Sequence, residues 1–529
     1  MTNSLRFVCF VTALVCSAFL SSAAYANNLS ITNVSLGSRN PTANTVILQF
    51  DLSLENSWRT KINHDAIWIT VRLYNPATSP ANKKLCQISA SGLNPSGTSV
   101  GNSSDLEISV PNDKLGAFLR PLNYGMGKNI SASDVELTID YGSCGFEDND
   151  TVNASVLGIE MVYIPEGSFY AGDYDASIAA LDQGSADSAP WYISSNVPIN
   201  VDNPSSGGYR YVSNNNAGED STGTSFTIPA SFSKGYGAFY AMKYEITEGQ
   251  WVEFLNSLPS AEARANRDLT DGNHKNTDSV KYRNTINCSG TPLSCSTSRP
   301  SRPVSYLTWM DLSAFLDWVA LRPMTELEFE KVARGPILPI AEEFAWGSNN
   351  IVPAATISSG AETGTEIILD SGANANYNNM IFSDGDAPSG VEHQEGPLRG
   401  GIFATTSSTR ETAGAGYYGV MDLSGNLRER VVTIGNVTGR NFIGSHGDGL
   451  LATVSGFEGN ATQADWPGID PISAKGITGA DGSGFKGGGW DDQSDGDRLR
   501  ISDRQDAANA STAAYNNAGG RGVRTYDGN

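Results

Sequence analysis

Glycine and small polar residues dominate the second half of this 529-residue chain, and they limit its fold more than any other feature. Beyond Gly335, short apolar patches alternate with stretches rich in Gly, Asn, Asp and Ser. A helix of a globular protein needs an apolar stripe that repeats about every 3.6 residues, and no such stripe continues here. The sequence therefore predicts ordered loops held by long-range contacts rather than a helical bundle.

Three helices are predicted ahead of this loop-rich half. The first covers about 247–258, where apolar residues recur on one face. Thr308 is the expected N-cap of the second helix. The third begins at Thr325, with Glu328 completing a capping box, and ends before Gly335. A polar stretch at 174–224 is expected to be a long surface insertion.

Residues 27–157 alternate apolar and polar positions in short runs separated by Asn, Gly, Pro and Ser. This pattern predicts a β-sandwich, because each run can bury one face of a strand. The overall fold class is therefore α+β, with an N-terminal β-sandwich before a loop-rich domain at 158–529.

Residues 1–26 have the pattern of a secretory signal peptide. Arg6 precedes an apolar run from Phe7 to Leu20, and small residues lead to Ala24-Tyr25-Ala26. The run is too short for a membrane span, and no transmembrane segment is expected in the mature chain. The protein should be exported, to the periplasm, the cell surface or the medium.

The net charge of −22 excludes a general nucleic-acid binder, which needs a basic face for phosphates. Four cysteines remain after the signal peptide. In an exported chain they favour two disulfides, Cys86–Cys144 and Cys288–Cys295, over the alternative of a zinc site.

Eight segments resemble the formylglycine-generating enzyme (sulfatase-modifying factor) family and occur in that family's order. They are Met161–Gly172, Phe239–Thr247, Arg302–Tyr306, Leu321–Glu330, Phe344–Gly347, Gly419–Asn426, Gly487–Trp490 and Arg521–Arg524. The resemblance implies a C-type-lectin-like fold for 158–529 and says nothing about 27–157.

Members of that family that oxidise a cysteine to formylglycine hold copper with two thiols shortly after the Gly-Gly-x-Trp segment. Here Asp492 and Asp497 fall near those places, and no cysteine follows Cys295. Hard carboxylates do not suit Cu(I), so we expect neither copper nor the oxidase reaction. His64, His274, His393 and His446 are scattered, and we assign none of them a catalytic role.

The resemblance also implies a structural calcium site, whose oxygens would come from Asp422, Gly425, Leu427 and Glu429. The family usually has Trp at the positions of Arg428 and Arg430, which changes the local packing. A second calcium site would use Asn376 and Tyr377 with Asp384 or Asp386. The alternative for Asp422 and Glu429 is a solvated turn and an acid at the start of a helix.

The segment after Gly487–Trp490 looks like the C-terminal part of the variable proteins of diversity-generating retroelements, some of which use this fold. Small polar residues and Tyr on a rigid scaffold form adaptable contact surfaces. The candidate contact residues are Asp491, Asp492, Ser494, Asp495, Asp497, Asp503, Asp506, Asn509, Ser511, Tyr515, Asn516 and Asn517. Arg498, Arg500 and Arg504 are expected to pair with acids as framework. A plain surface loop is the alternative.

The leading hypothesis is an exported, calcium-stabilised, non-catalytic protein that binds a protein or glycan ligand on the face formed by about 490–520. One alternative is a metal-dependent enzyme that modifies a protein substrate. Another is a calcium-dependent component of a surface layer or filament.

Overall fold

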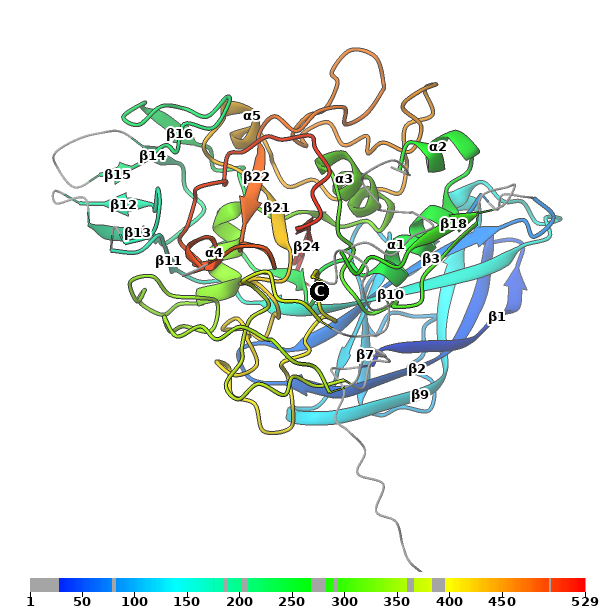
Figure 1. Cartoon of the computed structure of the whole chain (residues 1–529). Coiled ribbons are helices and arrows are strands. Elements are labelled where there is room, and N and C mark those ends of the chain that lie inside the picture. Colours follow the sequence, from blue (N-terminus) through cyan, green and yellow to red (C-terminus); the bar gives the residue numbers. More distant parts are fainter. Residues whose placement is uncertain are drawn as a thin grey trace, which may run out of the picture.

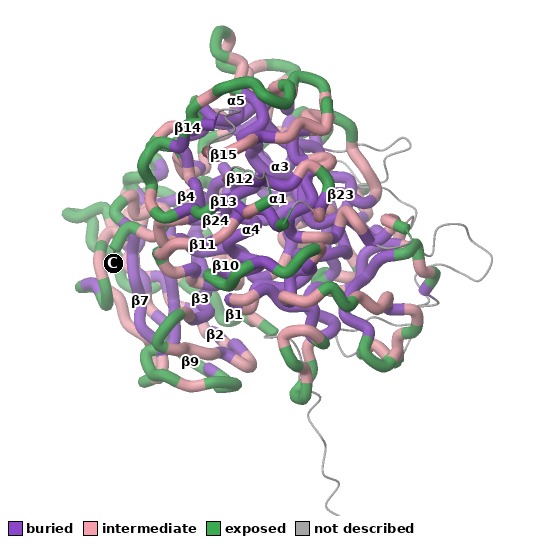
Figure 2. Tube along the Cα trace, turned by 90° about the vertical axis from the view of Figure 1, so that its left-hand side faces the viewer, coloured by how far each residue is buried: buried purple, intermediate pink, exposed green. Residues whose placement is uncertain are grey.

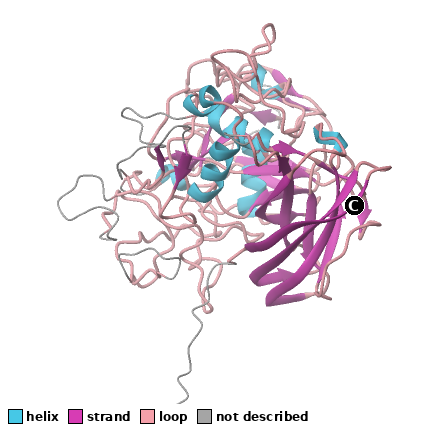
Figure 3. Ribbon diagram, turned by 90° about the vertical axis from the view of Figure 1, so that its right-hand side faces the viewer, coloured by secondary structure: helices cyan, strands magenta, loops and turns pink. Residues whose placement is uncertain are grey.

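The computed structural model describes residues 28–78, 82–174, 176–184, 188–201, 208–267, 282–289, 294–358, 366–382, 395–493 and 496–528. Within these ranges the chain is α+β, with many strands and loops and few helices (Figures 1 and 3). The predicted signal peptide lies outside them. No helix in the described part is long and apolar enough to span a membrane.

A four-stranded sheet opens the described chain. Its order is β1 (Ser30–Asn40), β2 (Thr45–Arg59), β9 (Gly125–Asp140), β5 (Gln87–Ile88). Every second residue of β2 is buried from Val46 to Leu54, because neighbouring side chains of a strand point to opposite faces. Leu48 and Phe50 on the inner face join one hydrophobic cluster with Ile67 and Ile69 of β3.

A nine-stranded sheet connects the N-terminal part with the rest of the chain. Its strands, in order, are β20 (Arg322–Pro323), β24 (Gly522–Thr525), β17 (Phe239–Met242), β10 (Asn153–Ile164), β3 (Asp65–Tyr74), β8 (Ala117–Pro121), β7 (Leu106–Val110) and β6 (Gly92–Leu93), with β4 (Lys84–Leu85) beside β3. β10 crosses the predicted boundary at 157/158 and pairs with β3 from Asn153↔Tyr74 to Val162↔Asp65. The two parts therefore share a continuous sheet.

Strand β3 is buried on both faces, which explains its nearly uninterrupted apolar sequence. Ile67 and Ile69 face the cluster shared with the four-stranded sheet, whereas Ala66 and Trp68 belong to the large core of the C-terminal part. Trp68 Nε1 donates a 2.9 Å hydrogen bond to the carbonyl oxygen of Val319. Figure 2 shows this buried interior running through β3, β10 and the strands around them.

The predicted helices are confirmed, each with a capping box. They are α1 (Glu248–Ser257), α3 (Trp309–Trp318) and α4 (Glu326–Arg334), and two short helices are α2 (Ala261–Ala265) and α5 (Val437–Arg440). Thr247, Thr308 and Thr325 are the N-caps of the three longer helices, and each hydroxyl accepts a backbone N–H in the first turn.

The expectation of a long surface insertion at 174–224 is wrong for much of that stretch. A six-stranded sheet includes part of it, in the order β11 (Phe169–Ala171), β13 (Ala189–Ile193), β12 (Asp182–Gln183), β15 (Tyr209–Arg210), β14 (Ile199–Val201), β16 (Phe226–Ile228). Leu181, Trp191 and Ile193 are buried in the large core. Isolated apolar residues among polar ones reach the core here through long-range pairing, which a local pattern does not reveal.

Beyond α4 the chain is mostly loops, as the glycine content predicts. Its regular elements are the sheet β22 (Ser483–Lys486), β21 (Arg428–Val432), β23 (Ala518–Gly519), the 3-10 turn η2 (Asp497–Leu499), α5 and β24. The hairpin β18 (Asn287–Ser289) and β19 (Ser294–Ser296) carries the disulfide Cys288–Cys295, and η1 (Gly142–Cys144) carries Cys144, which is bonded to Cys86. Both predicted disulfides are present, so these cysteines are not zinc ligands.

Candidate ligand-binding face and metal site

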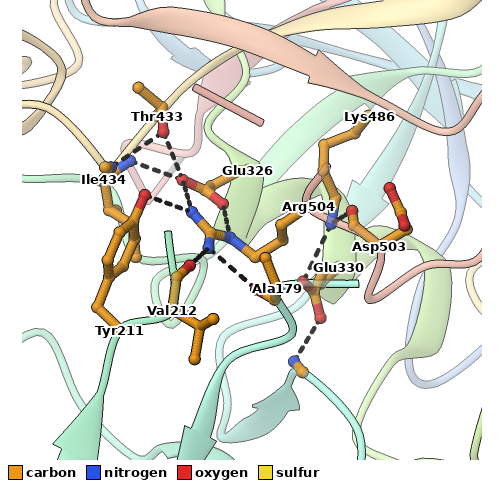
Figure 4. A network of polar contacts seen from close by, with 12 residues as sticks. Ala179, Tyr211, Val212, Glu326, Glu330, Thr433, Ile434, Lys486, Asp503 and Arg504 are labelled. Carbon is orange, nitrogen blue, oxygen red and sulfur yellow. Dashed lines mark hydrogen bonds and ion pairs between the residues drawn. The ribbon is translucent and has the colours of Figure 1, made fainter. Parts of the chain in front are cut away.

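Arg504 fixes the C-terminal segment to the core (Figure 4). Its Nε donates to Glu326 Oε2 at 2.6 Å, and its Nη2 donates to the hydroxyl of Tyr211 at 3.2 Å. Glu326 also accepts the backbone N–H of Ile434 at 2.7 Å. Burial opposes ionisation of Glu326, but Arg504 outweighs it and lowers the carboxyl pKa. One buried ion pair thus joins the C-terminal segment, α4 and the end of β21.

Lys486 holds the same segment one residue earlier. Its Nζ donates to the carbonyl oxygen of Asp503 at 2.6 Å and to Glu330 Oε1 at 3.3 Å. The side chain of Asp503 is buried as well, and its Oδ2 has no hydrogen-bond partner among the described residues. Burial raises the pKa of Asp503 to about 7.

Arg430 holds the loop at 511–515 from its buried side. It is fully buried, and its guanidinium donates to the carbonyl oxygens of Leu307, Ser511 and Ala513 at 2.8, 2.9 and 2.8 Å. Burial lowers the pKa of Arg430 to about 9. The planar fork of an arginine suits several carbonyl oxygens at once. Arginine at this position therefore supports the loop rather than disrupting the packing.

Arg428 supports the other side of the same loop. Its guanidinium lies 4.4 Å from the ring centroid of Phe485 and 4.4 Å from that of Tyr515. The Tyr515 hydroxyl in turn lies 2.8 Å from Ser511 Oγ. Cation–π contacts of this kind hold an aromatic ring in place. Tyr515 and Ser511, both predicted as contact residues, are thus positioned by the scaffold.

The acids near the positions of the family's thiols are engaged in pairs with arginines. Asp492 accepts from Arg498 Nη1 at 3.3 Å and from the backbone N–H of Gly489 at 2.7 Å. Asp497 lies 2.7 Å from Arg500 Nη2. Together with the Arg504–Glu326 pair, these contacts confirm that the three arginines pair with acids.

The predicted contact residues that the structure describes differ in their burial. Those that are partly exposed are Asp491, Asp492, Asp497, Asp506, Asn509, Ser511, Tyr515 and Asn516. Ser494 and Asp495 lie outside the described residues. Asp503 and Asn517 are buried, at 6% and 8% exposure, so they belong to the interior and not to a contact surface. Asn517 donates instead to Asp491 Oδ1 at 2.7 Å, which steadies that acid.

A cavity of about 550 Å³ borders the tip of the anchored loop, and no sequence pattern indicated it. Thr512 and Ala513 are exposed and line it, together with Ala514. Phe457 comes from the loop-rich half, and Arg267 follows α2, so the wall combines distant segments. A cavity of this size matches the usual range for small-molecule or side-chain binding.

Buried polar groups that bond to one another also line this cavity. Arg267 Nη1 donates to Asp311 Oδ1 at 3.2 Å, and Nη2 donates to Asn460 Oδ1 at 2.5 Å. Asp311 also accepts from the Thr308 hydroxyl at 2.7 Å as part of the α3 capping box. Arg267, Asp311 and Asn460 thus bond to one another, while Thr512 is exposed on the same cavity.

The predicted calcium ligands lie where the loop at 422–427 leads into β21, and Glu429 is the second residue of that strand. Asp422 Oδ2 accepts from Gly401 N at 2.7 Å. Arg521 binds both oxygens of Glu429, with Nε to Oε2 at 2.7 Å and Nη2 to Oε1 at 2.6 Å. Glu245, which the sequence analysis missed, accepts from Leu427 N at 2.9 Å. Three buried carboxylates therefore lie around one bidentate guanidinium.

The carboxylates of Asp422, Glu245 and Glu429 carry more negative charge than Arg521 alone can neutralise. Burial raises the pKa of Asp422 to about 6, and it raises those of Glu245 and Glu429 as well. The negative charges of Asp422 and Glu429 add to the shift of Glu245. Hard oxygen donors with surplus negative charge suit Ca²⁺. Among the described residues, however, no group of three or more His, Cys, Asp or Glu is arranged to hold a metal ion.

Asn376 provides a further oxygen atom that suits a cation. Its Nδ2 donates to Gly396 O and to Asn426 Oδ1, both at 3.0 Å, while its buried Oδ1 has no hydrogen-bond partner in the described ranges. A buried, unpaired carbonyl oxygen is rare and invites a ligand. Asp384 and Asp386, the acids predicted to complete this site, lie outside the described residues.

The two histidines that the structure describes, His64 and His446, contact neighbouring aromatic or backbone groups. His64 stacks on Tyr163 with ring centroids 4.9 Å apart, and its Nε2 lies 3.1 Å from the Tyr240 hydroxyl. Burial lowers the pKa of His64 to about 3. His446 Nε2 accepts from the backbone N–H of Thr525 at 3.0 Å. His274 and His393 lie outside the described residues.

These features define a class: a loop-rich α+β domain whose C-terminal segment is tied back by buried arginines and presents a loop beside a cavity. The sequence of residues 206–526 matches the FGE-sulfatase family, described as the sulfatase-modifying factor enzyme 1-like domain. The match covers more than half of the chain, and the protein belongs to this family. No curated protein matches this sequence.

Proposed function

We propose that this protein is an exported binding protein of the sulfatase-modifying factor family, with its ligand face at the C-terminal segment. The ligand is a protein or a glycan that contacts the loop at 511–515 and enters the adjoining cavity. In finer detail, we propose a C-type-lectin-like fold for the family part and a β-sandwich for the N-terminal part.

The observation that carries this proposal is the way Arg430 supports the loop. Three backbone carbonyl oxygens, two of them in the loop, are fixed from the buried side. Thr512 and Ala513 remain exposed at the rim of a cavity of about 550 Å³. A fixed backbone with small, exposed side chains is the arrangement of a binding loop, because side chains can vary without loss of the scaffold.

The oxidase reaction of the family is the competing function. It is disfavoured by the residues at the thiol positions, since Asp492 and Asp497 are engaged with Arg498 and Arg500. Carboxylates paired with guanidinium groups offer no soft ligand for Cu(I). Incubation of the mature chain with copper and a cysteine-containing sulfatase peptide tests this directly. We expect no aldehyde, and aldehyde formation would remove the binding proposal.

Calcium is proposed as a structural partner of the scaffold. Asp422, Glu429 and Glu245 supply surplus buried negative charge, and Asn376 supplies an unpaired oxygen. When bound, the ion would neutralise the carboxylates that Arg521 leaves uncompensated. Asp422 and Glu245 bond to the backbone N–H groups of Gly401 and Leu427 and so hold the loop that leads into β21. Strand β21 in turn carries Arg428 and Arg430.

We also propose that the C-terminal segment is diversified at the DNA level. Its partly exposed Asn509, Ser511 and Tyr515 lie beside backbone that the buried Arg430 and Arg504 hold, so this support does not depend on which side chains stand at those positions. The surrounding DNA tests this. A near-copy of the codons for 490–524 beside a reverse-transcriptase gene is expected, and a locus with neither would leave a plain, fixed binding loop.

A further inference from the structure

Exposed apolar side chains gather on two turns of the N-terminal part, far in sequence from the ligand face. Ile62 lies in the turn between β2 and β3, Leu122 and Tyr124 lie in the turn between β8 and β9, and Met126 is the second residue of β9. Their exposed fractions are 57%, 43%, 65% and 70%. These four residues are called the apolar tip. Large apolar side chains grouped in this way on a soluble surface mark an interaction site.

Arg59 holds the two turns side by side. Its Nη1 donates to the carbonyl oxygens of Pro121 and Leu122 at 2.6 and 3.0 Å, and its guanidinium lies 5.5 Å from the centroid of the Tyr124 ring. It is also paired with Glu107 Oε1 at 3.1 Å. The positive charge of Arg59 is thus used inside the protein, and the tip itself is a fixed structure.

The first turn is braced separately. The Thr60 hydroxyl accepts the backbone N–H groups of Ile62 and Asn63, both at 3.1 Å. Asn63 Nδ2 donates to the carbonyl oxygen of Tyr418 at 2.8 Å, which ties the turn to the family part. Ile62 therefore projects from a turn that needs no rearrangement to meet a partner.

The charge around the tip differs in sign from that of the whole chain. Lys61 and Lys128 are exposed beside it, and neither forms an ion pair within the part of the chain that the structure describes. Two acids lie nearby: Asp105 accepts from Asn123 Nδ2 at 3.3 Å, and Glu107 is paired with Arg59 and Arg120. Two free lysines beside four apolar side chains stand out in a protein of net charge −22.

We propose that the apolar tip docks the protein on an anionic lipid surface. The apolar side chains enter the boundary between headgroups and acyl chains, and the Tyr124 hydroxyl stays at headgroup level, as aromatic residues with a polar end do. Lys61 and Lys128 remain in the headgroup layer and meet the anionic lipids. Charge complementarity favours an anionic surface, because Lys61 and Lys128 are the exposed charged side chains that flank the four apolar residues.

Vesicle flotation tests this docking with the mature chain, whose signal-peptide cleavage is first verified by mass. The probes are vesicles of phosphatidylcholine with phosphatidylglycerol, and of phosphatidylcholine alone. We expect flotation with the anionic vesicles that weakens at high salt. Tyr124→Asp with Met126→Asp should reduce the vesicle affinity at least about tenfold. Lys61→Glu with Lys128→Glu should reduce it by roughly fivefold or more for each lysine.

Matched controls lie on other parts of the surface. Leu450→Asp changes an equally exposed apolar residue, at 68% exposure, and Lys84→Glu changes an exposed lysine. Both should float like the unmodified chain. The proposal is overturned if the unmodified chain does not float with anionic vesicles, or if the tip variants float as well as the controls. Capture of a protein partner by the tip without vesicle binding would overturn it too.

Discussion

The guanidinium of Arg430 donates a 2.9 Å hydrogen bond to the carbonyl oxygen of Ser511, and it does so from a fully buried position. A residue at the centre of the fold thereby sets the backbone of an exposed loop. Buried arginines therefore determine the backbone shape of the C-terminal face, and small exposed side chains determine its chemistry.

Replacement of Arg430 by Lys should destabilise the protein although the charge is kept. An ammonium group lacks the planar fork that reaches Leu307, Ser511 and Ala513 together, so at least one buried carbonyl loses its partner. We expect the free energy of unfolding to fall by about 2 to 4 kcal/mol, measured by chemical denaturation. Arg39→Lys, at an exposed ion pair, is the control and should change it by less than about 1 kcal/mol. Equal effects of the two changes would contradict the anchoring role.

Removal of one partner of the Arg504–Glu326 pair should cost more than removal of both. Glu326→Gln leaves a buried guanidinium without its counter-charge, and we expect a loss of about 3 to 5 kcal/mol. A double variant, Glu326→Gln with Arg504→Met, should lose less than the sum of the two single losses. Additive losses in denaturation experiments would show that the two side chains act independently.

The pH dependence of stability should contain a contribution from Asp503. Burial raises its pKa in the folded protein to about 7, above the value of 3.8 taken for an unperturbed Asp. The folded state therefore holds the proton more tightly, and the stability from this group is lost as the pH rises from about 4 through about 7. Asp503→Asn keeps an acceptor for Gln505 N and should remove this decline. A decline of the same size in the variant would assign it to other groups.

Calcium should raise the melting temperature, and a chelator should remove the rise. A site on the folded protein alone adds about 2.7 kcal/mol of stability at a concentration of about 100 times Kd. Asp422→Asn keeps the hydrogen bond from Gly401 yet reduces the negative charge, so the rise should shrink strongly. Asp148→Asn, at an exposed ion pair, is the matched control. A rise of unchanged size in Asp422→Asn would exclude the turn at 422–429.

Local sequence signals predicted the elements that depend on local interactions. The capping threonines Thr308 and Thr325, the pairing of Cys288 with Cys295 and the loop-rich half all follow from residues close in the sequence. The part of the site that depends on distant segments could not be predicted. Glu245 joins Asp422 and Glu429 only through the fold, and Arg267 meets Asn460 across nearly 200 positions.

Burial was the second quantity that the local sequence did not provide. Asp503 and Asn517 carry the same polar side chains as their exposed neighbours, yet Lys486 and Asp491 hold them inside. Trp191 lies in a polar stretch and is fully buried, because strand pairing with distant residues brings it into the core. In both cases long-range contacts, which have no signature in a short window, decide the outcome.

A comparison of two threonine variants tests whether the loop at 511–515 is the ligand face. The unmodified chain, Thr512→Arg and Thr42→Arg are applied to the same glycan array and displayed-peptide library. Thr512 is exposed at the cavity, and Thr42 is exposed in the turn between β1 and β2. We expect Thr512→Arg to lose the glycan or peptide signals that Thr42→Arg retains. Signals kept in Thr512→Arg, or lost equally in both variants, would contradict it.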